Sequence, residues 1–424
     1  MSGASGGALA GVRVLDLSIA WAGPAAGRAL AALGAEVIKI EAPARLDYWR
    51  ASIRRERLPD QVPGDKPYNR TAYFNTQNMG KRSIGIDLAK PRGVELVLDL
   101  AAVSDLVLAN FSGGVLGRLG LGRSALKRRN PAICIVEMPA FRDRSPMACH
   151  VGMGMTMEAA CGMASMMAYE DGRPVLSGPA YLDPIGGLHG AAAALAGLWR
   201  ARRTGRGCHV EVAQVDAAVR WIGEYLAHFE RTGRLPSPQG NSLEGTGPHD
   251  AFPCRGADQW LALAVTTQDE WTALVRRMGR PDLAADPRYR NPADRWTNRD
   301  ALYSTIAEWT RNHDKAELAA DLQVAGVPAA PVNSGQDLVA DGALAEIGFV
   351  SEVDHPEAGR HLYPGLAFGL RGTPTREPAP APCFGEATDY VLQDVLGLDP
   401  EAARSLLESG VVRREPDGQD IKDS

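Results

Sequence analysis

The 424-residue sequence has only six cysteines, and none of them stand in a pattern that binds zinc. They form no C-x-x-C pair, and the eight histidines are scattered without the ligand spacing of a metal site. Zinc sites and disulfide frameworks need closely or regularly spaced ligands, so we expect neither of them here, and no metal. The cysteines are Cys134, Cys149, Cys161, Cys208, Cys254 and Cys383.

The sequence also lacks an excess of positive charge and a long hydrophobic run. Its formal net charge of -5 provides no basic field for nucleic acid. The longest apolar stretch, GAAAALAGLW, is far shorter than the roughly 20 residues that cross a bilayer. The first residues, MSGASGGALAG, lack the cationic and apolar regions of a signal peptide. We therefore expect a cytoplasmic protein that binds neither nucleic acid nor membranes.

What the sequence does contain is a regular alternation of short apolar strands with helices. Residues 11–41 follow the order strand, turn, helix, strand, in the segments GVRVLDLS, AGPAAGRALAALG and AEVIKIE. Further strands are expected in SIGIDL, DLVLANF and AICIVEM. Such alternation is typical of a parallel sheet with helices on both faces. The pattern predicts an α/β fold with a Rossmann-like large domain.

The chain is longer than a single core normally supports, so we expect more than one domain. Residues 233–247 are rich in Gly, Pro, Ser and Asn, which indicates a linker. We assign residues 1–232 to the first part of the large domain and residues 248–322 to a smaller α+β domain. Residues 323–424 are expected to return to the large domain and to end in a polar tail.

The glycine loop from Ala22 to Gly27 is followed by a strand that ends in Glu41, an arrangement that also occurs in dinucleotide-binding proteins. However, the glycines do not have G-x-G-x-x-G spacing. Pro24 also removes an N–H where a phosphate would need one. These features argue against NAD binding.

Asp183 stands at the start of a long segment built largely from Gly, Ala and Leu. We expect a helix that begins at Pro184, with its positive dipole end directed at the Asp183 carboxylate. On local grounds an N-cap is the simpler interpretation, because Asp followed by Pro is a common way to begin a helix. The alternative is a reactive carboxylate. These residues alone leave both interpretations open.

Several segments, in order along the chain, resemble motifs of the class III CoA-transferases, the CaiB/BaiF family that includes formyl-CoA:oxalate transferases. Each motif is weak by itself, but their shared order over nearly the whole chain is specific. The matching segments are Val14 to Asp16, Ala22 to Pro24, Gly34 to Glu41, Asn78 to Ile84, Asn110 to Gly120, Asp183, Arg203 to Gly207, Gly326 to Val332, and Pro382 to Glu386.

This resemblance implies an architecture that periodicity does not reveal. Members of the family form interlaced, ring-shaped dimers in which both chain ends contribute to the large domain. The resemblance therefore implies a homodimer, or a heteromer with a related subunit. It implies no permanently bound cofactor, because CoA and acyl-CoA are substrates.

The resemblance also implies the chemistry of Asp183, which would act as a covalent nucleophile and carry CoA as an aspartyl thioester. Backbone N–H groups near the helix start, or in the loop Gly245 to Gly247, would stabilise the oxyanions. Residues at CoA-contacting positions of the family are Trp21, Ala22, Arg45, Asn78, Gly80, Lys81, Asn110, Phe111, Arg118, Phe141 and Arg142.

Three departures from the family pattern bear on function. Ala42 stands where the family often has Arg, so Arg45 is the candidate for that phosphate contact. Phe141 replaces an active-site tyrosine, which removes a hydroxyl. Met153 stands where the racemase branch has histidine, which argues against α-proton exchange. His150 is three residues out of place.

From these features we expect a CoA-transferase that uses an acyl-CoA donor such as succinyl-CoA. The acceptor is a carboxylic acid, for which we suggest a dicarboxylate or an aryl-substituted acid such as benzylsuccinate. Trp21 favours a large or aromatic acid, although its indole could equally pack as core. The alternatives are an α-methylacyl-CoA racemase or intramolecular CoA isomerase, and a non-catalytic subunit of a heteromeric transferase.

Overall fold

The computed structural model describes residues 7–169, 172–235, 240–373, 375 and 378–418. The chain divides into two compact units, each described separately below. Unit 1 comprises Met1–Ala164, Leu176–Arg234 and Gly342–Ser424, and unit 2 comprises Ser165–Val175 and Leu235–Asp341.

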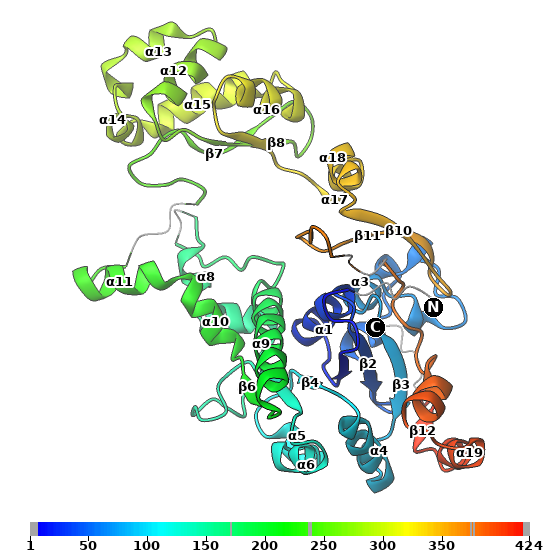
Figure 1. Ribbon diagram of the computed structural model, residues 1–424. Helices are drawn as coiled ribbons and strands as arrows, with labels where there is room; N and C mark the ends of the chain where they lie inside the picture. Colours follow the sequence, from blue (N-terminus) through cyan, green and yellow to red (C-terminus); the bar gives the residue numbers. More distant parts are fainter. Residues whose placement is uncertain (1–6, 170–171, 236–239, 374, 376–377, 419–424) are drawn as a thin grey trace. The chain divides into compact units, whose positions relative to one another are not determined.

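Unit 1 is built around a seven-stranded sheet with the order β12-β3-β2-β1-β4-β5-β6 (Figure 1). Every neighbouring pair is parallel except β12 with β3, which is antiparallel. The prediction of an α/β fold with a mainly parallel sheet is confirmed. The strands are β1 (Arg13–Asp16), β2 (Glu36–Glu41), β3 (Arg82–Ile86), β4 (Leu106–Ala109), β5 (Cys134–Glu137), β6 (His209–Glu211) and β12 (Val412–Arg413).

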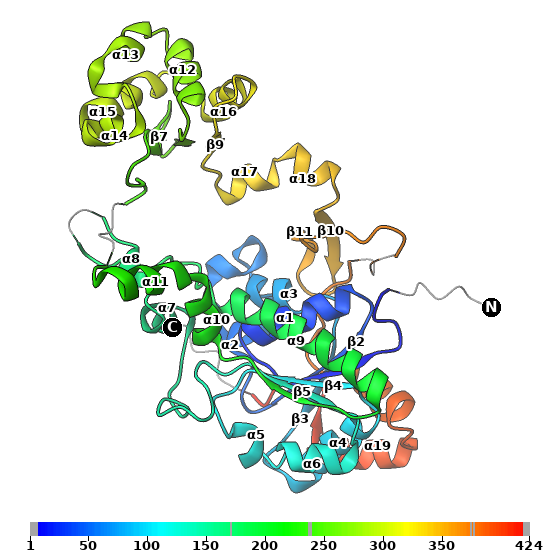
Figure 2. The same ribbon diagram turned by 60° about the vertical axis from the view of Figure 1, so that its left-hand side comes forward.

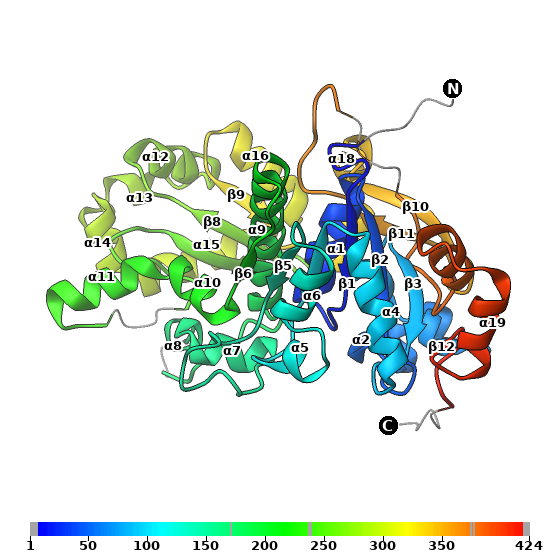
Figure 3. The ribbon, with the colours of Figure 1, turned by 60° about the horizontal axis from the view of Figure 1, so that its bottom comes forward.

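Both faces of this sheet are covered by helices, as Figure 2 shows. Helices α1 (Ala22–Ala32) and α9 (Leu182–Thr204) cover one face, and Figure 3 shows α4 (Pro91–Ala102) and α6 (Arg123–Arg129) in front of the other. Successive strand side chains point to opposite faces. Thus Val14 packs in the cluster of α1 and α9, and Leu15 packs in the cluster of α4 and α6.

The strand order 3-2-1-4-5-6 is that of the doubly wound Rossmann fold. In such sheets the chain reverses direction between the two central strands, here β1 and β4, and ligands bind beyond their carboxyl ends. The segments that follow β1 and β4 therefore position the candidate site.

The remaining described elements of unit 1 are short helices and a hairpin, and the residues of α8 (Met163–Met166) are divided between units 1 and 2. Helices α10 and α11 follow each other closely and are separated at Ile222. These elements are α2 (Tyr48–Ala51), η1 (Arg55–Arg57), η2 (Pro59–Gln61), η3 (Pro67–Asn69), α3 (Ala72–Gln77), α5 (Val115–Arg118), α7 (Gly154–Ala160), α10 (Gln214–Trp221), α11 (Gly223–Thr232), α18 (Gly342–Glu346), β10 (Val350–His355), β11 (Gly359–Pro364), η5 (Tyr390–Val395) and α19 (Pro400–Glu408).

Unit 2 packs helices on a three-stranded antiparallel sheet with the order β7-β8-β9. Its own hydrophobic core surrounds Trp271, which is fully buried. Its elements are β7 (His249–Pro253), β8 (Trp260–Ala264), α12 (Gln268–Arg277), α13 (Pro281–Ala285), η4 (Pro287–Tyr289), α14 (Pro292–Thr297), α15 (Arg299–Thr310), α16 (Lys315–Val324), β9 (Ala329–Pro331) and α17 (Gly335–Val339).

The expected return to the large domain at residue 323 differs from this division. Strand β9 pairs with β8, so the segment after α16 stays with unit 2 until Asp341. Ala329 of β9 lies in the core of unit 2, and a strand pairing of this kind leaves no local sequence signal. Within the expected linker 233–247, residues 236–239 lie outside the described residues.

Candidate active site

Asp183 lies in the first turn of α9, as its second residue. The expected N-cap role is therefore wrong, because the helix begins at Leu182 and not at Pro184. Tyr181 precedes the helix and already has helical backbone angles, whereas an N-cap residue has an extended backbone. The buried Leu182 anchors this early start. The Asp183 side chain is thus free of the capping role and is directed by the first helical turn.

The Asp183 carboxylate is half-buried beside the start of a second helix, α1. Burial raises the pKa of this carboxyl to about 6, although a hydrogen bond from the backbone of Ala22 opposes the shift. Ala22 is the first residue of α1, so its N–H has no partner within its own helix. At neutral pH Asp183 is therefore ionised, and it is a more basic carboxylate than an exposed one.

Glycines make the close approach of α1 and α9 possible. A Cβ on Gly187 would lie 2.7 Å from the carbonyl oxygen of Ala22, so a larger residue there would displace α1. A Cβ on Gly190 would lie 2.2 Å from the sulfur of Met138. The small-residue composition of α9 is thus explained by packing, and this packing brings Ala22 to Asp183.

Gly154, the first residue of α7, faces the same carboxylate. A Cβ at this position would lie 2.7 Å from Oδ2 of Asp183 and 2.2 Å from Cβ of Ala180. Gly154 was not predicted as a site residue from the sequence. A glycine between two methionines gives no local signal, because its role arises only from the contact with α9.

Trp21 lies at the end of a tightly held loop that follows β1. The amide of Asn110 accepts a hydrogen bond from Ile19 N at 2.9 Å and donates one to Ile19 O at 2.7 Å. Ala20 has a φ of 60° and donates to Oδ1 of Asp47 at 3.3 Å. The structure therefore brings the predicted residues Trp21, Ala22 and Asn110 to the carboxyl ends of β1 and β4, where Ala22 meets Asp183.

Lys81 and Asn78, expected to contact CoA, lie instead in a buried network below α1. The Lys81 ammonium donates to Oδ2 of Asp16 at 2.7 Å, to Pro24 O at 2.9 Å and to Oδ1 of Asn78 at 2.9 Å. These bonds use its three N–H donors, so the buried ammonium has none left for a phosphate. The expectation for Lys81 is corrected to a structural role, because tertiary packing buries this segment against β1.

Charge compensation stabilises this network. Burial alone would raise the pKa of Asp16, but Lys81 and Lys39 lower it below the ordinary value. Burial lowers the pKa of Lys81 to about 8, against the attraction of Asp16. At pH 7 both partners are charged, and the pair is fully buried.

The other predicted contacts lie at several places in unit 1. Arg45 follows β2 and Arg118 ends α5, and both side chains are exposed. Phe111 is half-buried against the core below α4. Phe141 packs edge-to-face on His150, with 6.2 Å between ring centroids. Arg142 forms an ion pair with Asp216.

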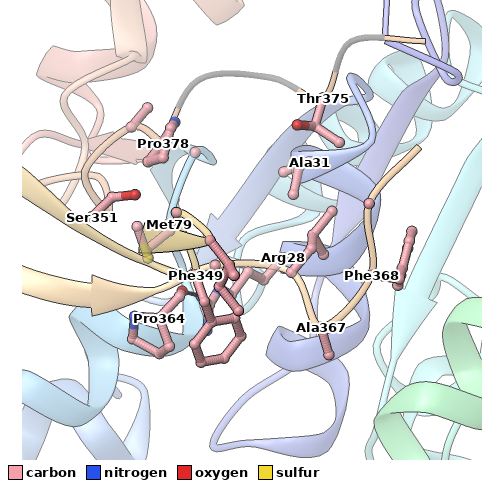
Figure 4. A pocket seen from close by; sticks show the side chains of 18 residues that line it. Arg28, Ala31, Met79, Phe349, Ser351, Pro364, Ala367, Phe368, Thr375 and Pro378 are labelled. Carbon is pink, nitrogen blue, oxygen red and sulfur yellow. Dashed lines mark hydrogen bonds between the residues drawn. The ribbon is translucent and has the colours of Figure 1, made fainter. Parts of the chain in front are cut away.

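Gly80 borders a cavity of about 560 Å³ that lies between α1, the β10–β11 hairpin and the segment after it (Figure 4). Figure 4 shows Arg28, Phe349 and Phe368 around this cavity. Gly80 has a φ of 72° and donates to the carbonyls of Ala379 and Pro380. Asp183 is not among the described lining residues, so this cavity is separate from the candidate nucleophile.

Two further properties of the described residues bear on the earlier expectations. None of their helices combines the length and the apolar character needed to cross a membrane. In the same part of the chain, no group of three or more His, Cys, Asp or Glu side chains is placed to hold a metal ion. The loop Gly245 to Gly247, suggested for oxyanion binding, belongs to unit 2, where Gly247 O accepts from Arg295 Nε at 2.6 Å.

Comparison with known proteins identifies the family. The model of CoA-transferase family III matches residues 9–388. The chain is 30% identical to Formyl-CoA:oxalate CoA-transferase of Streptomyces coelicolor over 96% of its own length and 99% of that protein. It is also 30% identical to Succinyl-CoA:glutarate CoA-transferase of Mus musculus, covering 96% and 90% of the two chains.

The chain belongs to CoA-transferase family III.

Solved structures of similar proteins agree with this membership. A CaiB/BaiF family protein from Brucella suis superposes with a TM-score of 0.82 at 26% identity, over 92% of this chain and all of that one.

Among the relatives found by sequence, Probable CoA-transferase Rv1866 of Mycobacterium tuberculosis is 30% identical, but this chain spans only 50% of the length of that protein. The resemblance noted from the sequence motifs is confirmed, and the chain is a class III CoA-transferase whose substrates include CoA thioesters.

Proposed function

We propose that this protein transfers CoA from an acyl-CoA donor to a carboxylic acid through a thioester on Asp183. The observation that supports the proposal is the surroundings of the carboxylate. It is half-buried, has a pKa raised to about 6, and receives the unpaired N–H of Ala22 at the switch point of the sheet. A half-buried, ionised carboxylate that faces a backbone donor is suited to nucleophilic catalysis.

The reaction proceeds in two symmetrical halves. Asp183 attacks the thioester carbonyl, which releases CoA thiolate and leaves a mixed anhydride. The thiolate attacks the aspartyl carbonyl, which releases the donor acid and forms aspartyl-CoA. The acceptor carboxylate then attacks this thioester to give a second anhydride and free thiolate. The thiolate attacks the acceptor acyl carbon, which yields the new acyl-CoA and restores Asp183.

The Ala22 N–H has a second role in these steps. Each attack at the aspartyl carbonyl places negative charge on an oxygen of Asp183, and a fixed backbone donor stabilises that charge. The hydrogen bonds that hold Ile19 and Ala20 keep this donor in place. For the CoA phosphates, Arg45 and Arg118 are the proposed contacts, because both are exposed cations in segments that follow β2 and β4.

For the substrates we propose succinyl-CoA as donor and a dicarboxylate or an aryl-substituted acid such as benzylsuccinate as acceptor. The relatives named above support a dicarboxylate, because oxalate and glutarate each carry two carboxylates. Trp21, next to Ala22, supports an acceptor with an aromatic group, which would stack on the indole. We further propose that the protein works as an interlaced homodimer or with a related subunit.

The deciding experiment is to trap the intermediate. The protein is incubated with succinyl-CoA, quenched with hydroxylamine or borohydride, and the modified residue is mapped by mass spectrometry. We expect the label on Asp183, and none in an Asp183→Asn control. Transfer without this label would contradict the mechanism. Exchange of the α-proton without an acceptor acid would instead indicate a racemase, and a protein that binds acyl-CoA but does neither would be a non-catalytic subunit.

A further inference from the structure

Glu158 in α7 is a buried acid to which the proposed reaction assigns no step. Its side chain has no exposed surface. Both carboxylate oxygens accept hydrogen bonds from one residue, Ser177, whose backbone N–H and hydroxyl each lie at 3.0 Å. A buried carboxylate is costly unless it is well hydrogen-bonded, so this pair of bonds fixes Ser177 firmly to α7.

Ser177 begins the segment that leads to Asp183 six residues later, and α7 holds that segment at both ends. Gly154 and Glu158 are four residues apart in α7 and therefore lie on one face of the helix. Glu158 holds Ser177, and Gly154 packs against Ala180 and the Asp183 carboxylate. Between them, Met157 is buried in one cluster with Leu182.

The held segment contains an unusual backbone conformation. Ala180 has a φ of 53°, which is uncommon for a residue with a Cβ. Its carbonyl accepts from the N–H of Asp183 at 3.1 Å, so this bend sets where α9 begins. A strained bend persists only where the surrounding structure holds it, and here the surrounding structure is α7.

We propose that Glu158 is a positioning residue for the reaction. By holding Ser177, it maintains the bend at Ala180 and so keeps the Asp183 carboxylate directed at the N–H of Ala22. The inference rests on the proposed function of Asp183, and it adds a residue that does not touch the substrate.

The test compares four variants of the whole chain with the wild type in steady-state transfer with succinyl-CoA. Glu158→Ala removes both acceptors, and we expect kcat to fall by about 10- to 100-fold because the nucleophile is misaligned. KM for the acyl-CoA should change by less than about twofold, since CoA binding is not involved. Ser177→Ala keeps the backbone donor and loses only the hydroxyl, so a smaller fall in kcat is expected.

Glu158→Gln is the conservative rescue. Its amide oxygen can accept from the Ser177 N–H, and its NH2 can donate to the hydroxyl, so both hydrogen bonds persist. We expect kcat within about threefold of the wild type. Leu406→Ala, in the core on the opposite face of the sheet, serves as a stability control. It should lower Tm without lowering kcat at temperatures where the fold is intact.

Each outcome has one meaning. If Glu158→Ala retains wild-type kcat, or if Leu406→Ala loses as much kcat at equal loss of Tm, the positioning role is overturned. The rate at which the thioester label appears on Asp183 distinguishes a failure of the positioning role of Glu158 from a failure of the proposed function. No label on the wild-type protein would overturn the nucleophile and Glu158's role together, whereas equal labelling rates in wild type and Glu158→Ala would overturn only the latter.

Discussion

Asp16 and Asp183 both contact α1, yet the protein gives these two carboxylates opposite surroundings. Asp16 is fully buried against the ammonium of Lys81, and a Cβ on Gly27 of α1 would lie 2.7 Å from its Oδ2. Its pKa is lowered, whereas burial raises that of Asp183, which accepts a hydrogen bond from the backbone of Ala22, to about 6. The first carboxylate stabilises the fold through its charge. The second keeps a charge that the fold disfavours, as a reactive group requires.

The largest expected effect is that of Asp183→Asn on activity. An amide cannot form the thioester, so transfer should fall by about 10⁴-fold or more. Stability should change in the other direction. Because folding raises the pKa of Asp183 from 3.8 to about 6, its ionisation lowers the free energy of unfolding as pH rises from about 4 to 6, and the full cost is present above pH 6. The variant should therefore be more stable than wild type at pH 8, and the difference in stability between the two proteins should be smaller at pH 4. Urea unfolding at both pH values and a coupled transfer assay test this pair of effects.

Asp16→Asn should give the opposite result in stability. It leaves the ammonium of Lys81 buried without its counter-charge, which typically costs about 3–5 kcal/mol. Asp389→Asn, which breaks the exposed pair with Arg414, is the matched control and should cost less than about 1 kcal/mol. Free energies of unfolding from urea titration compare the two. Equal losses would mean that the Asp16 pair contributes no more than a surface pair.

Gly187→Ala tests the contact that joins the two helices at the site. Its Cβ would lie 2.7 Å from the Ala22 carbonyl oxygen, and relief of this overlap should cost about 1–3 kcal/mol. Transfer activity should also fall, since Ala22 moves away from Asp183. Gly223→Ala, where a Cβ meets nothing within 4 Å, should change stability by less than about 0.5 kcal/mol. Thermal denaturation and kcat of both variants check the prediction.

The smallest effect concerns pH. Because only the ionised carboxylate attacks, kcat/KM should rise with pH with a midpoint near 6, the raised pKa of Asp183. At pH 5 it should be roughly a tenth of its value at pH 8. Circular dichroism at pH 5 must show an intact fold for the comparison to hold. A midpoint near the ordinary value of 3.8 would mean that the carboxylate is solvated during the reaction.

The sequence predicted the central sheet because the signals for its elements are local. Short apolar segments such as that around Val14 alternate with helices of consistent length, and burial on both faces explains their continuous hydrophobicity. The site was predicted less completely. Asp183 and Ala22 were selected from motifs, whereas Gly154, Glu158 and Ser177 were not, because their contacts join segments that have no shared sequence pattern.

Lys81 shows the limit of prediction from motifs. The resemblance to the family assigned Lys81 to a CoA-contacting position, but three internal acceptors surround this ammonium. The start of α9 shows the same limit. The bend at Ala180 makes Leu182 the first helical residue, so Asp183 is not the N-cap that the sequence predicted.

The sequence by itself determined the order of the first five strands, the family motifs and the presence of a carboxylate at the start of a helix rich in small residues. The tertiary structure decided which carboxylate is paired and which is not. Coulomb interactions and desolvation depend on distances across the sheet and between α1 and α9. Residues 65 positions apart, such as Asp16 and Lys81, neutralise each other, while the hydrogen bond that lowers the pKa of Asp183 comes from the backbone of Ala22.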